Sequence, residues 1–272
     1  PPLNEEKMIP FIQKLETRVN QVGSLLCVGI DPHQQDLPPQ HADSRSHPLL
    51  EFSLPLIEAC LPFAAAFKPN MAYFEAMGIE GLKLLETLLG QIDSAVPVIL
   101  DAKRSDIGET QKYYAQGYFA GWNVDAVTLN PFLGYDSLEP FLDWPDKGVY
   151  LLAVTSNPGS NDFQRQTLAD GRQVFELVTA LGERAKSEAR QTDVGYVVGL
   201  TNAADVLARM PDAPLLIPGL GAQGGDLAAL KHAARSAPDV INVSRGILYA
   251  QDDLSFAARA EQWAARIRDG LA

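Results

Sequence analysis

An apolar run near the middle of the chain ends abruptly in a cluster of charged side chains. The run spans residues 96–100, and Asp101, Lys103 and Asp106 follow within six positions. Such runs are typical of strands in parallel sheets, because these strands are buried on both faces. On an extended backbone Asp101 and Lys103 would point to the same side. A fixed ammonium can stabilise a developing negative charge and transfer a proton, so this stretch is the leading candidate for catalysis.

The same stretch also has a purely structural interpretation. Asp101 and Lys103 could form a surface ion pair at a strand end, and Ser105 and Asp106 favour a turn or a helix cap before a helix that starts at Glu109. We favour the functional interpretation, because the charges gather where α/β enzymes keep their chemistry.

Eight short apolar runs, each followed by a helical pattern, organise the rest of the chain. The expected strands are 24–30, 63–67, 96–100, 124–129, 149–154, 194–198, 214–217 and 240–243. The expected helices are 4–21, 49–61, 72–91, 109–122, 137–142, 174–190, 203–210, 227–235 and 254–267. This alternation indicates an α/β fold with a parallel sheet, and eight units in about 250 residues indicate a (β/α)8 TIM barrel. With an extra N-terminal helix and no linker, residues 1–272 are expected to form a single barrel domain.

Polar side chains stand at the ends of other predicted strands as well: Asp31, Lys68, Asn130, Ser156 and Arg245. In a barrel the carboxyl ends of all strands meet at one face, so we expect these side chains to share one site with the central charged stretch. A lysine at the mouth of a barrel needs a carboxylate or a phosphorylated ligand nearby, which favours a functional role for Lys68. For Asp31, metal ligation and capping of its own turn both stay open.

A glycine-rich turn spans residues 219–225, after the seventh predicted strand. It matches the dinucleotide-binding fingerprint, but the next strand ends in Ser244 and Arg245 instead of the expected acidic residue. Barrels commonly build a phosphate site from the loops after strands seven and eight, where backbone N–H groups and an arginine fork hold the anion. We favour a phosphate site over a dinucleotide site or a structural turn.

Composition argues against several classes of binding partner. The 272 residues carry a formal net charge of −12, which argues against binding to nucleic acid or to an anionic membrane. Neither a charged-then-apolar leader nor a long apolar run is present, so a cytoplasmic location is predicted. Cys27 and Cys60 lie in apolar patterns and are expected to be reduced core residues, and the four histidines lack zinc-site spacing, so no metal is expected.

Taken together, five segments resemble the orotidine 5′-phosphate decarboxylase family in its longer bacterial form. They are residues 67–70, 101–107, 155–159, 218–225 and 244–246. The likeness runs in order from Asp31 to the last strand. The Asp-x-Lys-x-x-Asp pattern is shared with 3-keto-gulonate-phosphate decarboxylase and hexulose-phosphate synthase, but those magnesium-dependent relatives place an acidic residue near the position of Lys68.

The resemblance implies a homodimeric, cofactor-free enzyme of pyrimidine (UMP) biosynthesis that converts orotidine 5′-monophosphate to uridine 5′-monophosphate and CO2. It implies a site in which Lys68, Asp101 and Lys103 of one subunit meet Asp106 of the partner subunit. The substrate-binding residues that it implies are Asp31 for a ribose hydroxyl, Ile107 and Thr110 reaching the partner's site, Asn130, Ser156 for the pyrimidine edge, and Gln223 and Arg245 for the phosphate.

Loss of CO2 from C6 leaves a poorly stabilised vinyl carbanion, which the ammonium of Lys103 would stabilise and then protonate. Two alternatives remain. A magnesium-dependent sugar-phosphate decarboxylase or aldolase of the same barrel is disfavoured by Lys68. A non-catalytic barrel that binds a phosphate ligand is disfavoured by Asp101, because a binder has no use for a carboxylate that faces an anion.

Overall fold

The computed structural model describes residues 9–37, 47–199, 204–220, 227–233 and 235–272. Its eight strands are β1 (Leu26–Ile30), β2 (Ala66–Pro69), β3 (Ile99–Arg104), β4 (Ala126–Leu129), β5 (Gly148–Val154), β6 (Asp193–Val198), β7 (Leu215–Ile217) and β8 (Val240–Val243). They form one parallel sheet in the order β2-β1-β8-β7-β6-β5-β4-β3. Parallel bridges from Phe67 to Val98 and from Asn70 to Asp101 join β2 to β3, so the sheet closes on itself. The prediction of a (β/α)8 barrel is confirmed.

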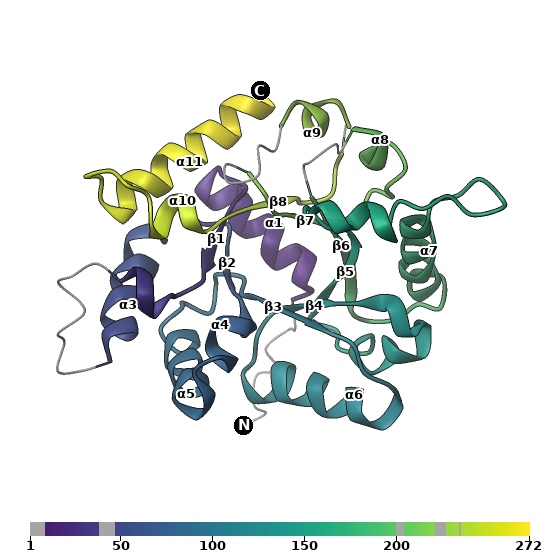
Figure 1. The fold of residues 1–272 in the computed structure, drawn as a ribbon, viewed down its shortest axis with the longest axis horizontal. Helices are drawn as coiled ribbons and strands as arrows, with labels where there is room; N and C mark the ends of the chain where they lie inside the picture. Colours follow the sequence, from purple (N-terminus) through teal and green to yellow (C-terminus); the bar gives the residue numbers. More distant parts are fainter. Residues whose placement is uncertain (1–8, 38–46, 200–203, 221–226, 234) are drawn as a thin grey trace, which may run out of the picture.

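The helices other than α1 (Phe11–Val22) surround the ring of strands, and α1 lies across it (Figure 1). The surrounding helices are α3 (Pro48–Cys60), α4 (Met71–Glu75), α5 (Gly78–Leu89), α6 (Gly108–Ala115), α7 (Val174–Ser187), α8 (Ala204–Leu207), α9 (Ala228–His232), α10 (Arg245–Leu248) and α11 (Phe256–Leu271). Their apolar faces and the outward side chains of the strands form the larger hydrophobic core. None of the helices described is long and apolar enough to cross a bilayer.

Several predicted elements differ in extent from the observed ones. The predicted helix 72–91 is two helices, α4 and α5, because Gly78 adopts φ +64° between them, a conformation that glycine reaches without strain. The predicted helix 137–142 is replaced by short 3-10 turns. The predicted third strand continues through the charged residues to Arg104, because polar side chains at the mouth of a barrel do not end the strand that carries them.

The extra helix α1 lies across the ring in Figure 1 and covers the amino-terminal end of the barrel. Phe11 packs edge-on against Tyr150 inside the barrel, with 5.9 Å between the ring centroids. The Ile12 amide donates to Asp193 at 2.8 Å, and Lys14 Nζ lies 2.5 Å from Asp125 Oδ1. Since Asp125 and Asp193 stand at the starts of β4 and β6, α1 closes this end and leaves the carboxyl end for a site.

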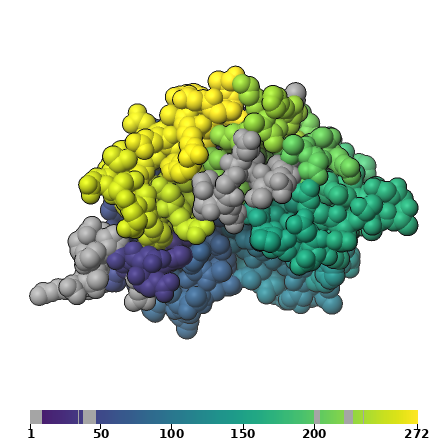
Figure 2. All heavy atoms as spheres, turned by 45° about the horizontal axis from the view of Figure 1, so that its top comes forward, coloured from purple at the N-terminus to yellow at the C-terminus, as the bar shows by residue number. Residues whose placement is uncertain are grey.

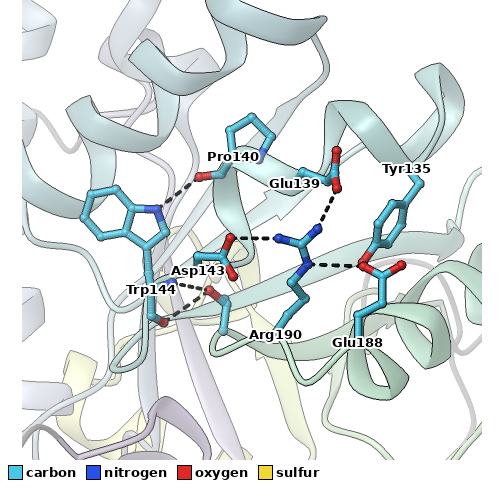
Figure 3. A network of polar contacts seen from close by, with 8 residues as sticks. Tyr135, Glu139, Pro140, Asp143, Trp144, Glu188 and Arg190 are labelled. Atoms are coloured by element: carbon cyan, nitrogen blue, oxygen red, sulfur yellow. Dashed lines mark hydrogen bonds and ion pairs between the residues drawn. The ribbon is translucent and has the colours of Figure 1, made fainter.

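Figure 3 shows a polar network on Arg190, which precedes β6. Its guanidinium contacts Asp143 at 2.9 Å, Glu139 at 2.6 Å and Glu188 at 3.3 Å. The Tyr135 hydroxyl donates to Glu188 at 2.9 Å. The network ties the segment before β5 to the segment before β6, at the end of the barrel that α1 covers, so its role is structural.

A second, smaller cluster fills the inside of the barrel. Cys27, Ile99, Ala126 and Tyr150 belong to it, one from each of four strands. Because side chains alternate along a strand, the next inward position on β3 is Asp101 and the next on β4 is Thr128. The charged stretch therefore sits directly on a packed apolar floor. The two cysteines are buried and free, as predicted.

Candidate active site

Asp101 is the centre of the site, and three side chains bind its carboxylate. Lys68 Nζ donates to Oδ2 at 3.0 Å, and Lys103 Nζ donates to Oδ1 at 2.6 Å. The Thr128 hydroxyl also donates to Oδ1, at 2.9 Å. The donors come from β2, β3 and β4, which are neighbours in the closed barrel. The structure thus brings together three of the residues predicted to be catalytic.

Burial and charge set the protonation states of this cluster. Burial alone would lower the pKa of Lys68, but the carboxylates of Asp101 and Asp31 outweigh it and raise this pKa above its ordinary value. Burial alone would likewise raise the pKa of Asp101, but Lys68 and Lys103 lower it well below its ordinary value. Lys68 and Asp101 therefore stay charged at neutral pH, despite their burial.

The backbone of β3 bulges where the cluster forms. Leu100 pairs with Val127 and Arg104 pairs with Leu129, so three residues of β3 face one residue of β4. Inside the bulge Lys103 has φ +49°, a left-handed conformation that costs a residue other than glycine about 1–2 kcal/mol. Bulges of this kind re-aim side chains next to active sites.

Arg104, the last residue of the Asp-Ala-Lys-Arg motif, points away from the cluster. It forms an ion pair with Glu75, donates to the Tyr118 hydroxyl and lies over the Tyr114 ring at 5.0 Å. These contacts hold α4 and α6 against β3, so the motif combines inward residues of the site with an outward structural anchor.

Asp31 follows β1 and lies close enough to Lys68 to raise its pKa. The residue is 9% exposed, and its Oδ1 has no hydrogen-bond partner among the described residues. Its backbone carbonyl accepts from the Tyr249 hydroxyl at 3.3 Å, which accepts in turn from the His33 amide at 2.7 Å. Figure 2 shows yellow carboxyl-terminal segments packed beside a purple segment from near the amino terminus. A buried, unpartnered carboxylate oxygen is ready to accept from a ligand hydroxyl.

Arg245 begins α10, directly after β8, and its side chain is exposed. Gly219 has φ +100° after β7, so the glycine turn begins where only glycine fits easily. Gln223, the other residue predicted to hold a phosphate, lies outside the described residues.

Tyr73, in α4, is a residue of the site that the sequence analysis missed. Its ring lies 4.5 Å from that of His33. Burial raises the pKa of Tyr73. The charge of Asp31 raises this pKa further and that of Arg245 lowers it, so Tyr73 lies among the charges of the site. The helical pattern of residues 72–91 gave no signal that this one aromatic ring packs beside His33, in the segment after β1.

Ser156 and Asn130 lie at the ends of β5 and β4. A side chain on Gly199 would place its Cβ 2.7 Å from Ser156 Cα, so this glycine makes room for the residue after β5. Asn130 Oδ1 accepts from the Phe132 amide at 3.1 Å and caps the short turn Pro131–Leu133. Its predicted contact with substrate stays a prediction.

The structure does not bring Asp106, Ile107 and Thr110 into the cluster around Asp101. The three residues lie beyond the bulge, and none of them contacts the Asp101 carboxylate, whose donors belong to other residues. Asp106 Oδ1 accepts from the Ile107 amide at 2.8 Å. Residues 105–107 form no turn, and no side chain caps α6, so the turn or cap expected at Ser105 and Asp106 is absent. Ile107 is 61% exposed, and Thr110 lies exposed on α6. Ile107 and Thr110 therefore face outward, and Asp106 is half-buried.

Across the described ranges, no group of three or more His, Cys, Asp or Glu side chains is arranged to hold a metal ion. The oxygens of Asp101 are engaged by two ammonium groups and a hydroxyl. This arrangement suits stabilisation of a negative charge by fixed cations.

Comparison with known proteins gives a consistent result. Residues 24–260 match the model of the orotidine 5′-phosphate decarboxylase / HUMPS family. A curated orotidine 5′-phosphate decarboxylase of Herpetosiphon aurantiacus is 41% identical over 93% of this chain and 94% of the relative. One of Methylibium petroleiphilum is 44% identical over 91% of this chain and 93% of the relative. The solved structure of Leishmania donovani OMP decarboxylase, 36% identical, superimposes with a TM-score of 0.80 over 97% of this chain and 99% of that one. The chain therefore belongs to the orotidine 5′-phosphate decarboxylase / HUMPS family.

Proposed function

We propose that this protein decarboxylates orotidine 5′-monophosphate to uridine 5′-monophosphate and CO2, a step of pyrimidine biosynthesis. The observation that carries the proposal is the Lys68–Asp101–Lys103 array at the carboxyl end of the barrel. Its relatives that share more than 40% of its residues over nearly their whole length bear the name of this activity.

In the proposed reaction the bond from C6 to the carboxylate breaks and its electron pair stays on C6. The ammonium of Lys103 stabilises this carbanion and gives it a proton, and the resulting amine regains a proton from solvent. The Lys103 side chain is 48% exposed, so solvent can reach it. Asp101 orients Lys103 and repels the substrate carboxylate, a repulsion that is relieved as neutral CO2 leaves.

The remaining site residues would hold the nucleotide. Asp31 offers its unpartnered oxygen to a ribose hydroxyl, and Ser156 reads the pyrimidine edge. Arg245 grips the phosphate together with Gln223, and a guanidinium suits this role because it forms a charge-assisted fork with phosphate. Energy from the distant phosphate contacts can then be used to order the reacting end.

The active unit in this proposal is a homodimer with shared sites, in which Asp106, Ile107 and Thr110 reach the partner's site. Exposed apolar side chains after three neighbouring strands support it: Ile107 after β3, Phe132 after β4 and Phe163 after β5 are 61%, 69% and 51% exposed. The rings of Phe132 and Phe163 lie in contact, and exposed apolar side chains that gather in this way mark interaction surfaces. A single barrel domain, independence of cofactors and metals, and a cytoplasmic location stay predictions.

A turnover assay tests the proposal. The purified chain is mixed with orotidine 5′-monophosphate in excess EDTA, and uridine 5′-monophosphate and CO2 are measured. We expect full turnover. Turnover that EDTA abolishes and Mg²⁺ restores would identify a metal-dependent relative, and binding of the nucleotide without any product would identify a non-catalytic barrel.

A further inference from the structure

We propose that Thr128 is a positioning residue of the decarboxylation, which holds Asp101 and Lys103 in their reactive arrangement through one hydroxyl group. The inference rests on the proposed function of the Lys68–Asp101–Lys103 array, and adds a residue that the sequence pattern does not indicate. Thr128 lies in β4, is fully buried, and stands inward above the apolar floor of the barrel.

The hydroxyl of Thr128 makes two hydrogen bonds of opposite sense. The backbone N–H of Lys103 donates to Oγ1 at 2.9 Å. Oγ1 lies 2.9 Å from Asp101 Oδ1. An amide can only donate and a carboxylate can only accept, so the single hydroxyl proton must point at Asp101. The orientation of the hydroxyl is therefore fixed by its two partners.

The position of Thr128 explains why this hydroxyl is needed. It is the one residue of β4 between the pairs Leu100–Val127 and Leu129–Arg104, opposite the three residues of the β3 bulge. A bulge disrupts the ladder and leaves its extra residues without their regular partners. The Thr128 side chain gives the Lys103 N–H a partner and so supports the left-handed backbone at φ +49°.

Asp101 is oriented by the same atom. Its Oδ1 receives Lys103 Nζ at 2.6 Å and the Thr128 hydroxyl at 2.9 Å, so the hydroxyl occupies one side of this oxygen and the ammonium another. Without the hydroxyl, both the carboxylate and the backbone of Lys103 lose a fixed partner. The ammonium would then spend less time where C6 reacts, and small displacements of a catalytic group cost rate steeply.

The test compares three variants with the parent chain. Thr128→Val keeps the shape of the side chain and removes the hydroxyl, and Thr128→Ser keeps the hydroxyl. Thr179→Val is the matched control, because Thr179 is a buried threonine on α7 whose hydroxyl donates to the Glu176 carbonyl at 3.0 Å. For each protein, kcat, KM, the affinity for uridine 5′-monophosphate and the melting temperature are measured.

We expect Thr128→Val to lower kcat by about 10- to 100-fold, the effect of removing one partner from buried hydrogen-bonding groups. KM and the affinity for uridine 5′-monophosphate should change less than about threefold, because the nucleotide contacts proposed for Asp31 and Arg245 do not involve Thr128. Thr128→Ser should keep kcat within about threefold of the parent, and Thr179→Val should leave kcat unchanged.

Three results would overturn the inference: a Thr128→Val protein that keeps its kcat, a Thr128→Ser protein that loses as much as the valine variant, or losses of activity that follow the melting temperature equally in the Thr128 and Thr179 variants. If Thr128→Val fails to fold, the kcat of Thr128→Ser decides. A parent chain without turnover would overturn the proposed function itself, and this inference with it.

Discussion

Lys68 and Lys103 bind different oxygens of the same carboxylate, that of Asp101. Lys68 reaches Oδ2 at 3.0 Å and Lys103 reaches Oδ1 at 2.6 Å. The two ammonium groups differ in exposure, since the Lys68 side chain is 5% exposed and that of Lys103 is 48% exposed. Under the proposed mechanism this difference assigns them different roles: buried Lys68 holds Asp101, and accessible Lys103 meets C6.

The first prediction follows from this division. Lys103→Ala should lower kcat by about 10²- to 10⁴-fold, the usual contribution of a positioned general acid. With orotidine that lacks its phosphate as substrate, kcat should fall by the same factor, because Lys103 acts at C6. Lys83→Ala is the control, since Lys83 is an exposed lysine paired with Glu80 on α5. Steady-state kinetics check both, and a Lys103→Ala protein with more than a tenth of the parent kcat would contradict the assignment.

The second prediction concerns acid stability. Burial opposes the charge of Asp101, but Lys68 and Lys103 hold its pKa well below the ordinary value, and the unfolded chain has a pKa of about 3.9 for such a group. The stability from this carboxylate is complete above about pH 3.9 and is lost as the pH falls toward the folded-state pKa, by about 1.4 kcal/mol per pH unit.

Asp101→Asn has no carboxyl group to titrate at this position. Below about pH 4 its free energy of unfolding should therefore fall less steeply than that of the parent. Urea unfolding at pH 5, 4 and 3 measures the two slopes, and Asp253→Asn, at an exposed position, controls for the change in net charge. Parallel curves for the parent and Asp101→Asn would refute the coupling between Asp101 and the two lysines.

Much of the barrel could be predicted, because each strand is a short apolar run and each outer helix repeats its apolar residues at helical spacing. The contact between Asp101 and Lys103 was expected from two positions on one side of a regular strand, but the structure forms it through the bulge that contains Lys103. The break at Gly78 was missed, because apolar periodicity continues across it while the backbone turns at φ +64°.

The role of Thr128 lay beyond sequence reasoning for a different reason. It depends on the register shift between β3 and β4, which is a relation between two strands and leaves no local pattern. Tyr73 was missed because the face that a helix residue presents to a barrel mouth depends on how α4 docks. By contrast, the interaction of Lys68 with Asp101 follows once β2 and β3 are adjacent, as the alternating pattern predicts.

The third prediction concerns Arg245, at the start of α10. Hydrogen bonds to charged groups contribute about 1.5–3 kcal/mol, so Arg245→Ala should lower kcat/KM for the nucleotide at least about tenfold. Orotidine without phosphate should be a poor substrate for the parent and hardly worse for the variant. Arg268→Ala, at an exposed position of α11, is the control. An equal loss for both substrates would show that Arg245 does not bind the phosphate.

The fourth prediction tests whether two subunits share each site. Asp106 lies beyond the bulge, and its carboxylate accepts from the Ile107 amide. It makes no contact with the Asp101 carboxylate, whose ammonium donors are Lys68 and Lys103. Asp106→Ala and Lys103→Ala should each be nearly inactive alone. In a hybrid dimer with shared sites, one of the two sites receives Lys103 from one chain and Asp106 from the other, and is intact.

Random exchange of subunits makes half of the dimers hybrid, so about one quarter of all sites, and of the parent activity, should return on mixing. Exchange is verified by mass spectrometry of differently tagged chains, and each variant mixed with itself is the control. If Asp106 served its own subunit, both sites of every hybrid would lack one residue. Proven exchange without recovered activity would therefore exclude a shared site.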